Sequence, residues 1–586
     1  MSKSETIYKR KAGWVNQSDA SYQAGFNSKL FGWLYTPDSA IIQSTGFILC
    51  APVGHEYIHT HRAYRHFAEM LAMHGFPCLR FDYSGVGDSA DYSGQDIFQR
   101  WVVDIEQQAQ WLRDEAGVKH IVFFGLGFSA NLVAVVAEKQ ALPCSIVLWE
   151  PYQTGRAFQR KLAALARLSE FKVETEAGFV ESAGFAFAEA AFDDLSQFDL
   201  ASRRLSNIQR CILIESMENR EKNTDWLSSV GISTQAKRIY RPDFAKMLDE
   251  PHKTTIPFDV FGEIIALFKV DGKEPALNQV PAIHLAPSLE SKDYAETIIN
   301  CNGNLFGVLT MPANGDRSKP LVILSNAGAA HHVGPSQIYV KLARYLSANG
   351  WCTFRYDLSN LGDSCTGCPD DENFPYAESA IGELKGIIDY FSSEFNSCIL
   401  AGLCSGAYMS FHAGLNVSDE KVSKVILVNP LTFEWVDGMS LDVPSPKMQS
   451  KEANYYSAAL KDKSRWIRLL KGKVDYKGIA KFTLQYSYQK IRHKLHDLCL
   501  AANLAKPNKL QAELLQYEKS NVDLSFIFSD TDPGYKLLTD NAGSVAASLI
   551  SDNSIKLHFV ENADHTFSFN KMQSRFFNKF LTALNN

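Results

Sequence analysis

An internal repeat is the feature that most constrains the fold of this chain. Three landmarks recur in the same order at an offset of 275 to 277 positions: Leu-Phe-Gly at 30–32 and 305–307, Arg-x-Asp…Gly-Asp-Ser at 80–89 and 355–364, and Gly-Leu at 125–126 and 402–403. Such order and spacing predict two copies of one large domain, not a solenoid of short units. Directly after the third landmark the first copy has Gly127, whereas the second has Cys404.

Each copy alternates between strand-like and helix-like stretches. In the first copy, the strand-like runs at 45–50 and 120–124 alternate with predicted helices at 64–74 and 97–115. This alternation indicates βαβ units and a mostly parallel, doubly wound sheet. With 586 residues, each half of the chain is long enough for one such α/β domain.

The second copy contains the pattern of a nucleophile elbow. Gly402-Leu403-Cys404-Ser405-Gly406 follows a predicted strand and precedes a predicted helix, in the form Gly-x-nucleophile-x-Gly. The glycines permit a very tight turn, so that the nucleophile projects above the sheet. The N-terminus of the following helix favours the thiolate form of a cysteine. We therefore predict Cys404 as the nucleophile; the alternative is a small buried cysteine in a turn.

The acid and the base of a catalytic triad are expected later in the chain, in that order. The predicted strand at 524–528 runs into a loop that holds Asp530 and Asp532. We favour Asp532, because the acid in this loop usually precedes an apolar or proline residue, and Asp530 remains the alternative. The strand at 555–560 leads to His565, the expected base.

Two backbone N–H groups are expected to form an oxyanion hole. One belongs to Ser405, and the other to Gly328 or Ala329 in the loop after the third strand. His331 and His332 follow in the same loop. They are either polar residues at the mouth of the site or contacts to the substrate.

The first copy is expected to be catalytically silent, because Gly127 offers no nucleophile. Ser129 lies two residues further on, where its hydroxyl would point along the helix. His55-Glu56 and His59 match the zinc motif H-E-x-x-H, but zinc ligation needs both histidines on one helix, and we expect the motif to start in the loop after a buried strand. We therefore predict no metal site and no cofactor.

The copies diverge after their sixth strand. The first has an insertion at about 153–210 and the second a longer one at about 436–521, rich in lysine and arginine and poor in acids. Insertions at this point form helical caps over the site in α/β hydrolases. Most basic helical runs are solvated faces; alternatively, this one recognises an anionic acyl-carrier protein or coenzyme A.

The composition is that of an ordinary globular protein. Hydrophobic residues make up 46% of the chain, and no stretch approaches the roughly 18 to 20 uncharged apolar residues of a membrane span. The start of the chain shows no secretory signal. The 11 cysteines mostly lie in strand-like runs, which favours free thiols in a cytoplasmic protein. A net charge of −6 argues against a generic nucleic-acid binder, and the oligomeric state stays open.

These motifs resemble two bacterial α/β hydrolase families found with exosortase A and exopolysaccharide systems. The second copy is similar to the type-one family in its Gly-Leu-Cys-x-Gly-Ala elbow, its Arg-Tyr-Asp…Gly-Asp-Ser turn and Val428-Asn429-Pro430. The first copy is similar to the type-two family, at Pro52…Glu56, Trp149-Glu150-Pro151 and Ala183-Gly184-Phe185. The resemblance implies two tandem α/β-hydrolase domains, 1–285 without a nucleophile and 286–586 with one.

The leading hypothesis is an acyl ester or thioester hydrolase, or an acyltransferase, that works through an acyl-cysteine. Cys404 would attack the carbonyl, His565 would move the proton and Asp532 would orient His565. One alternative is a polyhydroxyalkanoate-synthase-like polymerase, although its single catalytic domain would not predict a repeat. The other is a non-catalytic scaffold of two degenerate domains. Acyl chain, carrier and acceptor stay open.

Overall fold

The computed structural model describes most of the chain. The described residues are 8–16, 29–38, 42–168, 175, 177–182, 184–217, 226–232, 236–241, 244–269, 277, 285–364, 372–417, 420–436, 439 and 506–586. The basic insertion predicted at about 436–521 therefore lies largely outside them.

The chain divides into two compact units. The first comprises residues 1–316, 329–374 and 567–573, and the second comprises 317–328, 375–566 and 574–586. Segments 286–316 and 329–374 of the second sequence copy thus belong to the same compact unit as the first copy. Sequence repeat and spatial contacts divide the chain at different places.

The first copy forms an eight-stranded sheet in the order β1-β2-β4-β3-β5-β6-β9-β10. Its strands are β1 (Tyr8–Asn16), β2 (Lys29–Pro37), β3 (Thr45–Cys50), β4 (Cys78–Phe81), β5 (His120–Leu126), β6 (Cys144–Trp149), β9 (Ile208–Glu215) and β10 (Ala236–Tyr240). The strands from β4 to β10 pair in parallel, whereas β1 and β2 are antiparallel.

Alternate residues of these strands face opposite sides of the sheet. Phe47 and Phe124 belong to one buried apolar cluster, and their neighbours Ile48 and Phe123 belong to the other. Both faces are therefore covered, as expected for a doubly wound sheet. The covering helices are α1 (Glu56–Met73), α2 (Ile97–Ala116), α3 (Phe128–Lys139) and α9 (Phe258–Lys269), with the short α7 (Trp226–Ser229) and α8 (Phe244–Met247) after the insertion.

Helix α1 begins eight residues before the helix predicted at 64–74. Its first turns are rich in histidine and threonine, which hid the helical periodicity. Tyr57 and Ile58 are nevertheless buried, and Thr60 donates its hydroxyl hydrogen bond back to the Glu56 carbonyl. As expected, the motif starts in the loop, where His55 is the N-cap of α1, but Glu56 and His59 already lie within the helix.

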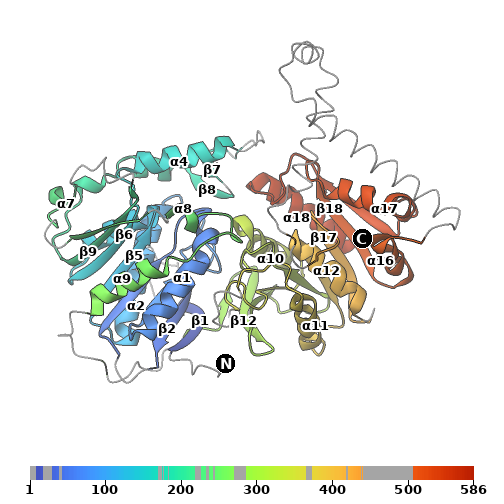
Figure 1. Cartoon of the computed structure of the whole chain (residues 1–586), viewed down its shortest axis with the longest axis horizontal. Helices are drawn as coiled ribbons and strands as arrows, with labels where there is room; N and C mark the ends of the chain where they lie inside the picture. The colour runs from blue at the N-terminus through green and yellow to red at the C-terminus, as the bar shows by residue number, and fades with distance from the viewer. Residues whose placement is uncertain are drawn as a thin grey trace, which may run out of the picture. The chain divides into compact units, whose positions relative to one another are not determined.

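The insertion of the first copy is not purely helical. It contains α4 (Gly155–Leu168), the antiparallel strands β7 (Phe179–Ser182) and β8 (Phe185–Ala188), α5 (Glu189–Ser196) and the short helix η1 (Leu200–Ser202). Figure 1 shows α4 lying across the end of strands β5 and β6. Apolar side chains of α4 and β8, among them Phe158 and Phe187, join the core of the sheet.

The second copy repeats this strand order with one extra edge strand, β11-β12-β13-β15-β14-β16-β17-β18-β19. These strands are β11 (Ser288–Glu290), β12 (Tyr294–Cys301), β13 (Leu305–Pro312), β14 (Leu321–Ser325), β15 (Thr353–Tyr356), β16 (Cys398–Leu403), β17 (Val422–Val428), β18 (Asp523–Ser529) and β19 (Ile555–Val560). Its helices are η2 (Pro335–Gln337), α10 (Ile338–Ala348), α11 (Ser379–Phe391), α12 (Ser405–Asn416), α16 (Lys509–Lys519), α17 (Gly534–Ser551) and α18 (Asn570–Asn585). Two mostly parallel sheets with the same strand order confirm the predicted α/β fold class, with one doubly wound sheet in each sequence copy.

Candidate active site

Cys404 lies at the sharp turn between β16 and α12. Its φ of 60° and ψ of −113° are left-handed and strained for a residue with a side chain. The turn closes because Gly402 and Gly406 are glycines: a Cβ on Gly402 would lie 2.4 Å from the carbonyl carbon of Gly406. Cys404 is only partly buried, so its sulfur can meet a substrate. This is the local geometry of a nucleophile elbow.

The structure brings His565 and Asp532 together with Cys404 in one compact unit. His565 Nδ1 lies 2.5 Å from Asp532 Oδ2, and Cys404 is close enough to the same imidazole to act on its pKa. Burial opposes a charge on His565, but Asp532 and Cys404 outweigh it and raise its pKa to about 10. The other oxygen of Asp532 accepts the Gly534 N–H at 2.8 Å, which fixes the carboxylate.

Asp530, the alternative acid, has a different set of partners. Its two oxygens accept the backbone N–H groups of Asn562 at 3.0 Å and Ala563 at 3.4 Å. It therefore ties the loop after β18 to the loop after β19. Of the two acids, Asp532 is the one whose carboxylate contacts the His565 imidazole.

Asn429, which follows β17, holds the same two loops. Its side-chain amide donates to the His565 carbonyl at 2.8 Å, and its side-chain oxygen accepts the Ser529 N–H at 2.8 Å. Asn429 adopts a φ of 42°, a conformation that asparagine tolerates better than most residues. The sequence showed it only as a point of family resemblance, without a role.

The loop after β14 does not offer Gly328 as a free oxyanion donor. The Gly328 N–H donates to Ser405 Oγ at 2.8 Å, and that hydroxyl donates to the Asn326 carbonyl at 3.3 Å. Ser405 thus anchors the loop through its side chain. Its own N–H is at the first position of α12, where helix N–H groups have no intrahelical acceptor. Ala329 lines a small cavity with Ile58 and His331.

Tyr376, which sequence reasoning missed, lies beside the nucleophile. Its buried ring stacks on Trp435, with the ring centroids 4.2 Å apart and an interplanar angle of 8°. The Tyr408 ring packs edge-on against it at 5.3 Å. Burial, followed by the nearby Cys404, raises the pKa of Tyr376, so the hydroxyl keeps its proton. No motif in the sequence marks this tyrosine.

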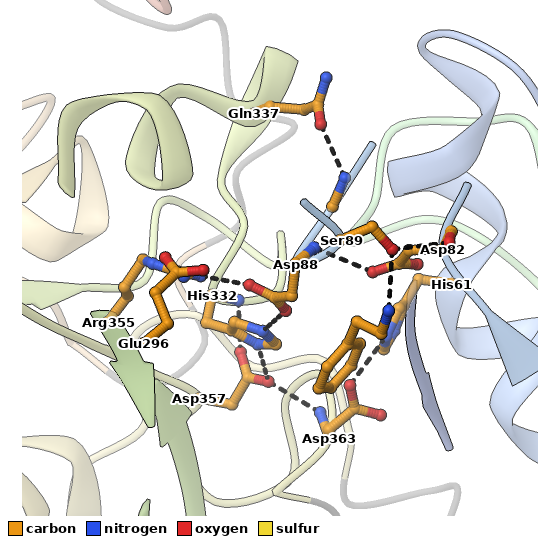
Figure 2. A network of polar contacts seen from close by, with 12 residues as sticks. His61, Asp82, Asp88, Ser89, Glu296, His332, Gln337, Arg355, Asp357 and Asp363 are labelled. Carbon is orange, nitrogen blue, oxygen red and sulfur yellow. Dashed lines mark hydrogen bonds and ion pairs between the residues drawn. The ribbon is translucent and has the colours of Figure 1, made fainter. Parts of the chain in front are cut away.

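His331 and His332 are buried and lie in the first compact unit. His332 Nδ1 is 2.8 Å from Asp357 Oδ2 and its Nε2 is 2.7 Å from Asp88 Oδ2 (Figure 2). Burial opposes a charge on His332, but the two carboxylates raise its pKa to about 10. The His331 ring stacks on His61 at 4.0 Å, and burial lowers its pKa. Both imidazoles are thus interior groups with partners inside the protein, and whether either contacts a substrate stays a prediction.

The duplicated turns of the repeat meet in the same network. Arg80 of the first copy pairs with Asp363 of the second, and Arg355 of the second pairs with Asp88 of the first at 2.5 Å. Arg80 and Arg355, like Asp88 and Asp363, are separated by 275 positions. The contact is therefore reciprocal, as in the isologous interface of a symmetric dimer. In Figure 2, Arg355 also reaches Glu296.

Within the described residues, the group best arranged for a metal ion is in this network. Single ligand atoms of His332, Asp357 and Asp363 lie within 4.8 Å of one another. Their charges already have partners, however: Asp363 is paired with Arg80, and both ring nitrogens of His332 face carboxylates. The cluster is a set of buried ion pairs, which stabilises the contact between the two copies.

The elbow of the first copy keeps its backbone shape without a nucleophile. Gly127 has φ 60° and ψ −128°, close to the values at Cys404. A Cβ on Gly127 would lie 2.7 Å from Oε2 of the buried Glu56, whose other oxygen is paired with Lys161. The Ser129 hydroxyl bonds back to Leu126. A carboxylate thus fills the position of a nucleophile side chain.

Eight described cysteines are free thiols, seven of them buried, and Cys404 is the partly exposed one. In the described part of the chain, no helix has both the length and the apolarity needed to cross a membrane.

Comparisons with known proteins find likeness in structure but not in sequence. No protein-family profile and no curated protein matches the chain. An esterase from Pyrococcus furiosus matches 45% of this chain over 91% of its own length, at 16% identity and a TM-score of 0.32. An α/β serine hydrolase without a lid, from Xanthomonas campestris, matches 46% of this chain over 97% of its own, at 15% identity and 0.30.

A third solved structure is the Butyrivibrio proteoclasticus esterase Est1E with bound ferulic acid. It matches 42% of this chain over 95% of its own length, at 13% identity and a TM-score of 0.29. Each of these proteins covers less than half of this chain. At such identities the likeness concerns the fold alone.

Proposed function

We propose that this protein is an enzyme of the acyl ester and thioester hydrolase class, with Cys404 as nucleophile, His565 as base and Asp532 as the orienting acid. One observation carries the proposal: a partly exposed cysteine at a strained elbow acts on the pKa of a histidine, which is hydrogen-bonded in turn to a buried aspartate. This is the arrangement that activates a nucleophile by an adjacent base.

The proposed reaction has two steps. In the first, Cys404 Sγ attacks the carbonyl carbon with its proton already on His565, because the raised pKa of His565 favours the protonated imidazole. The tetrahedral intermediate collapses as His565 returns the proton to the leaving thiol or alcohol, which leaves an acyl-cysteine. In the second, His565 takes a proton from water or an acceptor, whose oxygen or sulfur attacks the acyl group and releases Cys404. Asp532 holds the His565 Nδ1–H throughout.

A thioester is the substrate that best suits a cysteine nucleophile. Attacking and leaving sulfurs have similar basicity, so the tetrahedral intermediate partitions forward without strong activation of the leaving group. The resemblance to hydrolases found with exosortase A systems supports an exopolysaccharide setting for such acyl chemistry. An acyl-carrier protein or coenzyme A would supply the acyl group, in the cytoplasm, where the free thiols persist.

The first test is turnover of a panel of acyl-coenzyme A thioesters by the full chain. Cys404→Ala should abolish thiol release, because no other described cysteine lies at an elbow. Cys398→Ala, which changes a buried thiol of the same strand β16, should retain activity. If thioesters of every chain length are left intact by the wild type, the non-catalytic scaffold becomes the better account.

A further inference from the structure

The Ser405 side chain joins the nucleophile elbow to the loop after β14. Ser405 is the first residue of α12 and is fully buried. Its Oγ accepts the Gly328 N–H at 2.8 Å and donates to the Asn326 carbonyl at 3.3 Å. One hydroxyl therefore holds two points of the loop, and all three residues lie in the same compact unit as Cys404.

The backbone is packed closely at this place. Strands β14 and β16 pair in parallel, with Ser325 opposite Gly402, so the two strands end side by side. A Cβ on Gly406 would lie 2.5 Å from the Ser325 carbonyl oxygen and 2.8 Å from that of Asn326. The first turn of α12 thus lies directly against the start of the loop, and the Ser405 hydroxyl is buried in this contact. Breaking hydrogen bonds inside such a contact is costly, so they hold the loop in one position.

We propose that the Ser405 side chain positions the loop after β14 as part of the oxyanion hole; the inference rests on the proposed function of Cys404. The Ser405 N–H directly follows the nucleophile and is the predicted first donor. The Gly328 N–H is occupied by Ser405 Oγ, and the next N–H, that of Ala329, stays the predicted second donor. Because the Ala329 N–H belongs to the peptide group that begins at Gly328, the bond to Ser405 fixes one end of that group.

The hydroxyl of Ser405 acts in this proposal through position and not through contact with the substrate. A donor held in place before the reaction stabilises the oxyanion because it undergoes no reorganisation in the transition state. Removal of the hydroxyl would leave the Gly328 N–H without its acceptor, and the loop would relax. A misplacement of about 1 Å costs about 100-fold in rate. A loosened loop should therefore slow acylation without changing the nucleophile itself.

The experiment compares two reactions of Cys404 in the full chain, each followed on the peptide that contains this residue. Acylation by p-nitrophenyl acetate builds an oxyanion, whereas alkylation by iodoacetamide displaces iodide at a saturated carbon and builds none. Ser405→Ala keeps the backbone N–H and removes only the hydroxyl. It should slow acylation by about 10- to 100-fold and leave the rate of alkylation unchanged.

Ser410→Ala is the matched control. Ser410 is a fully buried serine of the same helix, and no described residue forms a hydrogen bond with its hydroxyl. Its loss should change neither reaction.

Gly328→Ala repeats the test from the side of the loop. The added Cβ would meet no atom within 4 Å, but the φ of 59° is strained for alanine. This variant should also slow acylation and spare alkylation, so the inference is tested even where Ser405→Ala does not fold.

Three outcomes would contradict the inference. Equal slowing of both reactions in Ser405→Ala would mean that the hydroxyl supports the elbow or the fold and not the oxyanion. Unchanged acylation in this variant would mean that the anchor takes no part in the reaction. If Cys404→Ala still releases p-nitrophenol at the wild-type rate, the proposed function itself fails and the inference fails with it, whatever the behaviour of Ser405→Ala.

Discussion

At the scale of single residues, the two acids after β18 differ in what their carboxylates accept. Asp532 contacts the His565 imidazole, whereas Asp530 contacts the backbone of the neighbouring loop. The sequence favours Asp532 because a proline follows it, and this rule says nothing about the distance between the carboxylate and the His565 imidazole. The structure adds that distance, 2.5 Å.

Asp532→Asn should therefore reduce kcat by about 10⁴-fold, because an amide oriented to donate would hold His565 in the wrong tautomer. Asp530→Asn is the matched control. It keeps the loop shape through its remaining oxygen and should change kcat only a few fold. Steady-state thioester hydrolysis measures both. A greater loss in Asp530→Asn would transfer the role of acid to that residue.

A second prediction concerns the silent elbow. Gly127→Cys should destabilise the protein, since its Cβ would meet Glu56 Oε2 at 2.7 Å and its φ is left-handed. We expect a loss of roughly 1 to 3 kcal/mol in the free energy of unfolding by urea. In a Glu56→Ala background the loss should shrink, because the collision is gone.

Glu138 provides the control for this pair, as it forms an ion pair with Arg203 and does not approach Gly127. Glu138→Ala should leave the cost of Gly127→Cys unchanged, since distant sites are additive. If Gly127→Cys lowers the free energy of unfolding equally in the wild type, in Glu56→Ala and in Glu138→Ala, then Glu56 does not fill the elbow.

At the scale of elements, the duplicated turns after β4 and β15 form the contact between the first copy and segment 329–374. Each turn contributes one arginine and one aspartate to the partner turn. Replacing only one member leaves an uncompensated buried charge, at a cost of about 3 to 5 kcal/mol. Arg355→Met and Asp88→Asn should each show this loss in urea unfolding, and the double variant should cost less than the two losses together. Strict additivity would show that the two groups are not coupled.

His332 gives this contact a dependence on pH. Its pKa in the folded protein is about 10, against an ordinary value of 6.5. The stabilisation is therefore complete below about pH 6.5 and is lost as the pH rises through 10. His332→Asn should consequently destabilise the protein more at pH 6 than at pH 10, as measured by urea unfolding.

His412→Asn is the control for this pH dependence, because burial lowers the pKa of His412 instead of raising it. Its effect on stability should not shrink between pH 6.5 and 10. A pH-independent effect of His332→Asn would mean that the imidazole is neutral between its two carboxylates.

At the scale of the whole molecule, sequence periodicity and the repeat predicted the two sheets. The alternation of strand-like and helix-like stretches is encoded locally, and it recurs in the same order in both copies. The elbow was equally predictable, since two glycines and a cysteine at fixed spacing determine the turn. Glu56 and Tyr376 were not predictable. Their roles depend on which distant residues they contact, and no local pattern encodes the position of Lys161 or Cys404.

The duplicated turns at 80–89 and 355–364 show the same limit of prediction from the sequence. Within one copy each turn has the composition of an ordinary loop. Its reciprocal pairing arises only when two copies meet, so the division at 285/286 inferred from the repeat does not follow the compact units of the structure. A duplicated motif can be read from the sequence; the surface on which its copies meet cannot.

We propose that only one of the two copies carries out chemistry. The most direct measurement is the stoichiometry and position of the acyl group after rapid quenching with an acyl-coenzyme A substrate, by intact mass and peptide mapping. We predict one acyl group per chain, on the peptide that contains Cys404. Two acyl groups, or one on a peptide of residues 1–285, would contradict the account.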